Sequence, residues 1–445
     1  MRQRKAGVLL HPTSLPSGRI DDQAWQFLDW MEQAGLRVWQ MLPLSEPVQG
    51  LSPYQSVSAF AMNPALLPED WEARLDEKGY RQFLADPPHW LQNYALFMTL
   101  RNHFNQTSWS QWPTAYRNRG KQALADFAKT HATEVDHLKR QQYMLRKNWM
   151  ALKTAANAKG IALFGDMPIF VAYDSADVWA NPHQFKLDAT GQPTVVTGVP
   201  PDYFSETGQR WGNPHYDWEV MQADGFQWWL QRVRGELELF DLIRIDHFRG
   251  LEACWEIDAA EETAMNGHWV KVPGAALLKT LQETFAKLPL VAEDLGIITP
   301  EVVALKEQFD LPGMSVLQFG FNGLPDNPHS LKEQVENSVV YTGTHDNDTS
   351  LGWWQSLETD EYRHWVRKQL PATQAPMPWP LIQAAFESVA HLAVIPMQDF
   401  LGLDNHSRMN VPGTMDHNWR WQLKAQQLTS ALAAQVAELV HKTHR

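Results

Sequence analysis

Three segments of the chain each consist of a short apolar run that ends in an acidic residue. They are residues 242–247 (LIRIDH), 290–294 (LVAED) and 339–346 (VVYTGTHD). A buried parallel strand followed by an acid is the simplest interpretation of each run. Acids at the carboxyl ends of parallel barrel strands face one shared cleft. Cleavage of a glycosidic bond uses one carboxylate as nucleophile or base and another carboxyl group as proton donor, so the pattern predicts this chemistry.

The neighbours of the three acids suggest a different role for each. Arg244 lies two residues before Asp246, so alternation along a strand places a permanent cation beside this acid and favours its ionised form. Glu293 follows an apolar run and precedes a second acid, and both features raise the pKa of a carboxyl group. We therefore predict Asp246 as the nucleophile and Glu293 as the general acid and base. Asp346 follows His345, and this pair is predicted to bind adjacent hydroxyls of one sugar.

An acid after a strand more often caps a helix or carries surface charge. Asp294, Asp310 and Asp348 fit that simpler explanation. Three segments that repeat one design, each with a polar companion, favour a common site over three unrelated charges. The pattern alone does not identify the substrate.

Eight strand-like segments are separated by helical ones. We predict strands at residues 7–10, 38–44, 161–171, 242–248, 290–295, 315–321, 339–344 and 392–396, with helices that include 23–33 and 430–441. Strands that alternate with helices form parallel βαβ units, and eight of them close a (β/α)₈ barrel. The predicted fold class is α/β, a TIM barrel with insertions. Because only about 50 residues follow the last strand, no C-terminal β-sandwich is expected.

Two connections are longer than ordinary barrel loops. Residues 50–150 have a helical pattern and predict an inserted helical subdomain. Residues 172–225 are rich in Pro, Gly, Asp and aromatic residues, which predicts a loop-rich insertion that covers the active site. The whole chain, 1–445, is expected to form a single catalytic domain around the barrel.

Composition excludes several functional classes. A net charge of −13 argues against nucleic-acid or membrane partners, and one cysteine, Cys254, suits a reducing cytosol. His11 and Pro12 interrupt the apolar run at 6–10, so neither a signal peptide nor a membrane span is expected and the predicted location is cytoplasmic. No glycine-rich phosphate loop or EF-hand spacing occurs, so we expect neither a cofactor nor a metal. The 21 Trp include several in loops, such as Trp211, where aromatic rings suit the apolar faces of sugars if they are not simply packed in the core.

Longer motifs run through most of the chain. In chain order they are GVLLHPTSLP (7–16), SPYQ (52–55), GDMPI (165–169), VPPDYFS (199–205), GQRWGNP (208–214), IDHFRG (245–250), AEDLG (292–296), GTHDNDT (343–349), RMNVPGT (408–414) and NWRW (418–421). With these motifs the chain resembles the amylomaltase family of the α-amylase clan, also called 4-α-glucanotransferase or disproportionating enzyme. Only residues of about 65–150 fall outside the resemblance, and this insert is shorter than in many members, so we expect reduced outer donor subsites.

The resemblance implies an activity and a set of site residues. Enzymes of this family cut an α-1,4-glucosidic bond, hold the glycosyl portion on an aspartate and pass it, with retention, to the 4-hydroxyl of another glucan. By resemblance Asp246 is the nucleophile, Glu293 the acid/base and Asp346 the transition-state stabiliser. The substrate-binding residues implied are Arg244, His345, Asp166, Ser52, Tyr54, Asp202, Gln209, Trp211, His247 and Asn410. The implied partners are α-1,4-glucans and maltooligosaccharides, and monomer and homodimer both stay open.

Two other functions stay open at this stage. A hydrolase uses the same three acids, and what separates it from a transferase is whether water reaches the covalent intermediate. Tyr203 and Phe204, beside Trp211, are predicted to shield that intermediate, and Val171 stands where many amylases carry a histidine. Both features favour transfer. A glucan-binding protein without catalysis is disfavoured because all three acids are present.

Overall fold

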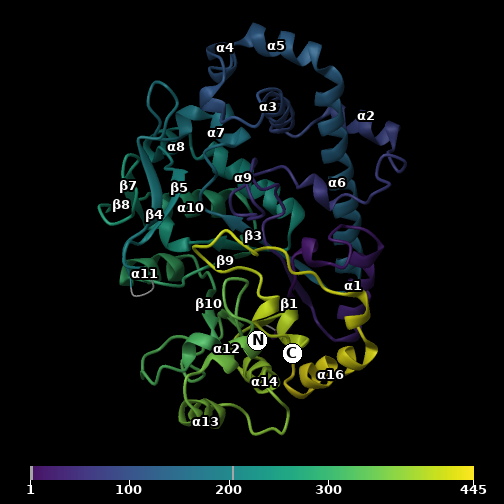
Figure 1. Cartoon of the computed structure of the whole chain (residues 1–445), viewed down its shortest axis with the longest axis vertical. Coiled ribbons are helices and arrows are strands. Elements are labelled where there is room, and N and C mark those ends of the chain that lie inside the picture. Colours follow the sequence, from purple (N-terminus) through teal and green to yellow (C-terminus); the bar gives the residue numbers. More distant parts are fainter. Residues whose placement is uncertain (1–3, 203–204) are drawn as a thin grey trace.

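Eight parallel strands form a nearly closed barrel in the computed structural model, which describes residues 4–202 and 205–445 (Figure 1). The strands are β1 (Lys5–Leu9), β2 (Val38–Gln40), β3 (Ala162–Pro168), β6 (Leu242–Asp246), β9 (Leu290–Ala292), β10 (Gly313–Val316), β11 (Ser338–Tyr341) and β12 (Leu392–Pro396). They lie in the order β10-β11-β12-β1-β2-β3-β6-β9. At the seam between the two edge strands, the Ala292 N–H at the end of β9 donates to the carbonyl of Pro312, just before β10, at 2.8 Å. The predicted TIM barrel is confirmed.

Each of the eight predicted strands is present, but the longest of them end before their predicted last residues. β2 ends at Gln40 and β3 at Pro168, although apolar residues continue in both cases. The apolar residues beyond these ends, such as Met41 and Ile169, are buried in loops above the barrel. Hydropathy therefore marks burial correctly and overestimates strand length, because a buried loop and a buried strand have the same composition.

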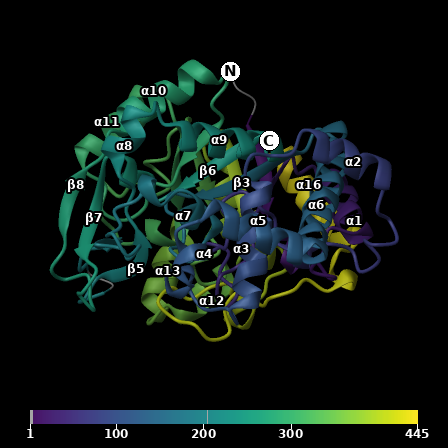
Figure 2. The same cartoon turned by 90° about the horizontal axis from the view of Figure 1, so that it is seen from above.

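Helices pack around the barrel. They include α1 (Asp22–Gln33), α9 (Gln227–Leu239), α10 (Gly274–Thr284), α11 (Pro300–Gln308), α12 (Ser350–Ser356), α13 (Asp360–Gln369), α14 (Trp379–Glu387), α15 (Met397–Phe400) and α16 (Ser430–Lys442). α1 begins where the Asp21 carboxylate accepts from the Gln23 N–H, and α16 where the Thr429 hydroxyl accepts from the Leu432 N–H. The two chain ends meet beside α16, since the Arg445 guanidinium donates to the Lys5 carbonyl at 3.1 Å (Figures 1 and 2).

Five helices lie between β2 and β3, in the region where a helical insertion is predicted. They are α2 (Glu77–Ala85), α3 (Leu91–His103), α4 (Thr114–Arg117), α5 (Lys121–Thr130) and α6 (Ala132–Ala158). α3 and α5 lie at the end of the molecule farthest from α13 (Figure 1). α6 has 27 residues and continues beyond the predicted boundary at residue 150 to lead directly into β3. The insertion and the barrel therefore share one continuous helix.

A second, antiparallel sheet extends from the barrel with the strand order β5-β4-β7-β8. Its strands are β4 (Val195–Val199), β5 (Gln209–Pro214), β7 (Ala253–Asp258) and β8 (His268–Lys271), and the short helices α7 (Ala176–Ala180) and α8 (Trp218–Ala223) lie nearby in the chain. The segment 172–225 was expected to be loop-rich, so β4 and β5 were missed. Gly198 explains this: a Cβ there would lie 2.2 Å from the Gln209 carbonyl oxygen, so the tight pairing needs a residue typical of loops. Figure 2 places this sheet on the opposite side from α1.

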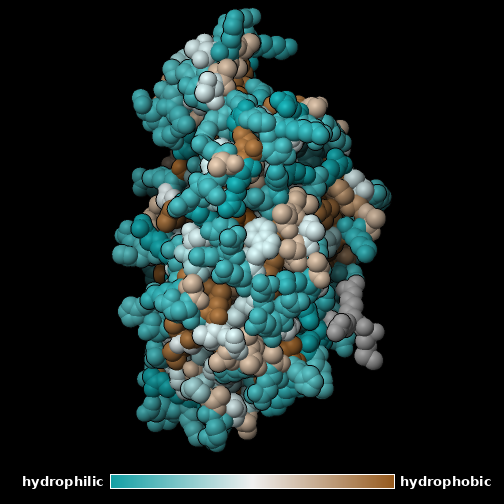
Figure 3. Space-filling model, turned by 90° about the vertical axis from the view of Figure 1, so that its right-hand side faces the viewer, coloured by the Kyte–Doolittle hydropathy of each residue, from teal (hydrophilic) through white to brown (hydrophobic). Residues whose placement is uncertain are grey.

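The core fills the barrel and the space between its strands and helices. Inside the ring, Phe164, Val316, Tyr341 and Val394 are almost completely buried. On the face beside α1 and α6 the surface is mostly hydrophilic, with apolar residues in small separate patches (Figure 3). Within residues 4–202 and 205–445, no helix is both long and apolar enough to span a membrane.

Candidate active site

A cleft opens at the carboxyl ends of the barrel strands. Its lining includes eleven of the thirteen predicted site residues: Ser52, Tyr54, Asp202, Gln209, Trp211, Arg244, Asp246, His247, Glu293, Asp346 and Asn410. The other two, Asp166 and His345, lie behind the wall of the cleft. This is the end of the barrel where such folds place their chemistry.

Arg244 connects three of the predicted residues beneath the cleft. Its Nη1 donates to both carboxylate oxygens of Asp166 at 2.8 Å, and its Nη2 lies 2.9 Å from Oδ1 of Asp246. The Tyr54 hydroxyl donates to Asp166 Oδ2 at 2.6 Å. The Asp166 side chain is fully buried, so it fixes Arg244 and Tyr54 and does not face the cleft. β3 and β6 are neighbours with Asp166 opposite Arg244, which explains why these two side chains meet.

Glu293 is held by the backbone of two loops. Its Oε2 accepts from the His247 N–H at 2.7 Å, and its Oε1 accepts from the Leu295 N–H at 3.0 Å. His247 has a φ of 55°, a left-handed conformation that is uncommon for residues other than glycine and is adopted more often by Asn, Asp and His than by the rest. This turn directly follows β6 and aims its N–H at the neighbouring strand end. The carboxyl group of Glu293 is thereby fixed beside Asp246 without using a cation.

Asp246, Glu293 and Asp346 face one cleft, and the charges of Glu293 and Asp346 both raise the pKa of Asp246. Burial raises the pKa of both Asp246 and Glu293, and the Arg244 guanidinium lowers both. Arg244 forms ion pairs with both Asp166 and Asp246. The sequence predicted the pair with Asp246 but not the pair with Asp166. Asp246 nevertheless has the direct ion pair, and 30% of its side chain is exposed to water, whereas Glu293 has only backbone donors. The ion pair with Arg244 favours the ionised form of Asp246. The two backbone N–H donors lower the pKa of Glu293, but burial outweighs them, so its pKa stays above the ordinary value.

Asp346 is positioned by two side chains. Asn410 donates from Nδ2 to Asp346 Oδ1 at 2.6 Å, and His345 Nε2 lies 3.4 Å from the same oxygen. The His345 ring stacks on Tyr54 with centroids 5.3 Å apart, and burial lowers its pKa, so it acts here as a neutral group. About 44% of the Asp346 side chain is exposed, so its carboxylate remains available to a ligand in the cleft.

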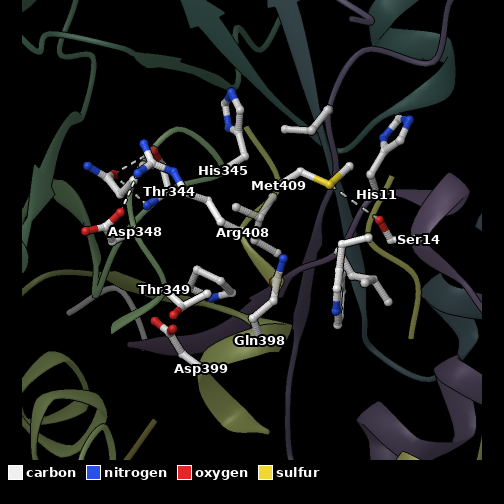
Figure 4. A pocket seen from close by; sticks show the side chains of 16 residues that line it. His11, Ser14, Thr344, His345, Asp348, Thr349, Gln398, Asp399, Arg408 and Met409 are labelled. Atoms are coloured by element: carbon white, nitrogen blue, oxygen red, sulfur yellow. Dashed lines mark hydrogen bonds and ion pairs between the residues drawn. The ribbon is translucent and has the colours of Figure 1, made fainter. Parts of the chain in front are cut away.

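Arg408 and Asp348 were not predicted, although they hold this side of the cleft together. Arg408 donates to the Asp346 carbonyl at 2.6 Å and to the Asn410 carbonyl at 2.8 Å, and it also pairs with Asp348. Figure 4 shows this ion pair beside His345. Asp348 is therefore not a helix cap, a role that the adjacent Thr349 has for α12. Arg408 lies two residues before the predicted site residue Asn410, and this spacing is the sequence feature from which its role could have been predicted.

The residues from the second sheet and its connections form the far wall. Trp211 meets His247 edge to face at 4.8 Å between centroids, and its Nε1 donates to Gln209 Oε1 at 3.2 Å. The His247 Nε2 is buried and has no hydrogen-bond partner among the described residues. Asp202 accepts from the Ser205 N–H at 2.8 Å. The predicted shield, residues 203 and 204, lies outside the described residues.

Glu236 lies below the cleft. The pH dependence of its effect on the free energy of unfolding tests whether burial raises carboxyl pKa values in this part of the fold. Burial raises its pKa from 4.5 to about 7, with Arg232 opposing and Asp166 adding to the shift. A carboxyl whose folded pKa is raised destabilises the fold as pH rises from its unfolded pKa through its folded one. Glu236→Gln is therefore expected to be more stable than the wild type at pH 8 by about 1 to 3 kcal/mol, and equal to it at pH 4.5.

Thermal unfolding of both proteins at the two pH values measures this difference. Glu219→Gln, at an exposed position of α8, is the matched control and is expected to shift stability by less than about 0.5 kcal/mol. An equal gain for Glu236→Gln at both pH values would contradict the assignment.

A barrel that gathers three carboxyl groups and an arginine at its strand ends defines an enzyme that acts on glycosidic bonds. The family described as 4-alpha-glucanotransferase matches residues 10–77 and 68–429. The chain is 43% identical to the 4-alpha-glucanotransferase of Thermus thermophilus, with 99% of each chain covered, and 41% identical to that of Synechocystis sp., with 98% and 97% covered. A solved amylomaltase from Streptococcus agalactiae in complex with acarbose superposes with a TM-score of 0.95 at 32% identity, over the full length of both chains. The chain therefore belongs to the 4-alpha-glucanotransferase family, as its motifs indicated.

Proposed function

We propose that the chain transfers α-1,4-glucan segments from a donor maltooligosaccharide to the 4-hydroxyl of an acceptor glucan or glucose. Membership of the 4-alpha-glucanotransferase family supports transfer as the class of reaction. The observation that carries the catalytic site is the Arg244–Asp246 contact of 2.9 Å beside a Glu293 whose two oxygens accept only backbone N–H groups. Asp246 is thereby held against a cation while Glu293 is not, and the retaining reaction needs such a difference between its nucleophile and its proton donor.

In the proposed mechanism Asp246 attacks C1 of the sugar at the cleavage point while the Glu293 carboxyl protonates the departing oxygen. A glycosyl ester forms on Asp246, and the leaving portion of the donor departs. Glu293, now ionised, then removes the proton from the 4-hydroxyl of the acceptor as this oxygen attacks C1 and releases Asp246. Two inversions give net retention. Asp346, with His345 beside it, binds hydroxyls of the same sugar and favours its distortion toward the oxocarbenium-like transition state.

We further propose binding roles for the remaining predicted residues. Arg244 and Asn410 hold the reacting site together, and Asp166 acts through Arg244 because its own side chain is fully buried. His247 lines the cleft beside Trp211 and is proposed to contact the sugar there. Ser52, Tyr54, Asp202, Gln209 and Trp211 line the cleft on either side of these groups and are proposed to contact the glucan.

The chain is proposed to work as one catalytic unit, 1–445, with the insertion at 172–225 over the cleft and the helical insertion at 50–150 beside it. Support for the first placement is that Val199, Gln209, Trp211 and Asn213 line the cleft. A cytoplasmic location is proposed because the chain has one cysteine, Cys254, which is buried and unpaired.

Incubation with pure maltotriose tests the proposed function. Transfer produces glucose together with maltopentaose and longer oligomers, because one glycosyl segment leaves a donor and lengthens an acceptor. Separation of the products by chain length over time is the measurement. An amylase-like hydrolase produces new reducing ends without elongation, so the absence of products longer than maltotriose would contradict transfer.

A further inference from the structure

Trp269 on β8 is an aromatic side chain in the cleft that sequence reasoning did not select. Its side chain lines the cleft and the residue is 38% exposed. Trp255, its partner across β7 and β8, packs against it edge to face with centroids 5.2 Å apart. Ile297, also in the cleft lining, is 50% exposed. Exposed apolar surface of this kind inside a cleft is typical of a ligand contact.

The ring is fixed from behind by Arg249. The guanidinium carbon lies 3.7 Å from the centroid of the Trp269 ring, and the Arg249 side chain is only 6% exposed. Arg249 donates to the Ile297 carbonyl at 2.9 Å. A cation stacked on one face holds the ring in a single orientation, so little conformational freedom is lost when a ligand binds the exposed part.

The position of Trp269 relative to Glu293 indicates which part of a glucan it meets. Arg249 ties Trp269 to the loop that begins at Glu293 and includes Ile297. Asp346 is held by a different set of residues, Asn410 and His345, and it binds the transferred sugar in the proposed mechanism. An acid/base lies next to the oxygen of the departing and incoming chain, so the wall beyond Glu293 faces the acceptor.

From this geometry we propose that Trp269, stacked on Arg249, forms an outer acceptor subsite for an α-1,4-glucan. The inference deepens the proposed function and rests on it. The ring packs against the apolar face of a sugar at least one unit beyond the residue whose 4-hydroxyl is glycosylated. Single glucose does not reach this subsite, whereas a maltotriose acceptor does. Trp269 therefore sets a preference for longer acceptors without touching the reacting atoms.

The test measures acceptor kinetics with a fixed maltooligosaccharyl fluoride donor whose terminal 4-hydroxyl is blocked, so that the donor cannot act as acceptor. Trp269→Ala is expected to raise KM for maltotriose about tenfold, to change KM for glucose less than about twofold and to leave kcat unchanged. Trp269→Leu keeps an apolar side chain against Trp255 without the aromatic ring and should show the same selectivity. If the alanine variant unfolds, the leucine variant carries the test.

Trp365→Ala is the matched control, because Trp365 lies on α13, is 36% exposed and does not line the cleft. It should change neither KM. An equal effect of Trp269→Ala on glucose and maltotriose, or no effect on either, would overturn the subsite. Failure of the proposed function has a different result, since the wild-type enzyme would then form no elongated product with either acceptor.

Discussion

Replacing Asp246 with asparagine is expected to lower kcat/KM for maltotriose disproportionation by at least about 10⁴-fold, equivalent to more than about 5 kcal/mol of transition-state stabilisation. An amide has no negative oxygen with which to attack C1, so the covalent route is closed. The side chain keeps its size, and Arg244 keeps both of its contacts with Asp166, so the fold should persist. Glucose release under steady-state conditions measures the loss.

Asp310→Asn is the matched control for that change. Asp310 is exposed at the opposite end of the barrel, just before β10, and has a φ of 51°, which asparagine tolerates well. It should retain wild-type activity. If Asp246→Asn kept the rate and the product distribution of the wild type, Asp246 would not be the nucleophile, and the assignment of the other two acids would have to be revised with it.

The barrel was predictable because its strands are buried on both faces and therefore appear as short apolar runs. The same logic failed for the second sheet. β5 has the sequence QRWGNP, which lacks any apolar run, and its pairing with β4 depends on Gly198 rather than on hydropathy. The strands of this insertion are stabilised by contacts with their partner strands. Such contacts cannot be predicted from one segment of sequence alone, because the pairing partner must be known.

Within the site, sequence spacing found the groups that end strands. Arg244 and Asp246 alternate along β6, so their shared face followed from the period of a strand. The spacing did not reveal that Arg244 also forms an ion pair with Asp166 on the adjacent strand, β3. Arg408 was missed for a similar reason, because its contacts to Asp346 and Asp348 join segments about 60 residues apart in the chain.

Replacing Glu293 with glutamine is expected to lower kcat/KM for maltotriose by about 10³-fold, because an amide cannot protonate the departing oxygen. Gln has one acceptor oxygen where Glu293 has two bonded ones, so the variant also loses one backbone contact, from His247 or Leu295. A second variant, Glu293→Ala, separates these effects, since it removes the acid without turning an amide N–H₂ toward a backbone donor. Glu307→Gln on α11, at an exposed position, should retain full activity.

The decisive measurement uses a maltosyl fluoride donor, whose leaving group departs without protonation. The first step should then proceed in Glu293→Gln, while attack by an acceptor hydroxyl remains slow without a base, so the glycosyl-enzyme should accumulate and peptide mass mapping should find it on Asp246. Burial raises the pKa of Glu293, and this acid is active when protonated. The wild type should therefore lose activity on maltotriose as pH rises through that pKa, whereas the fluoride reaction of the variant should have no such decline. An acid that acted only by holding structure would slow both donors equally and would leave the pH profile unchanged.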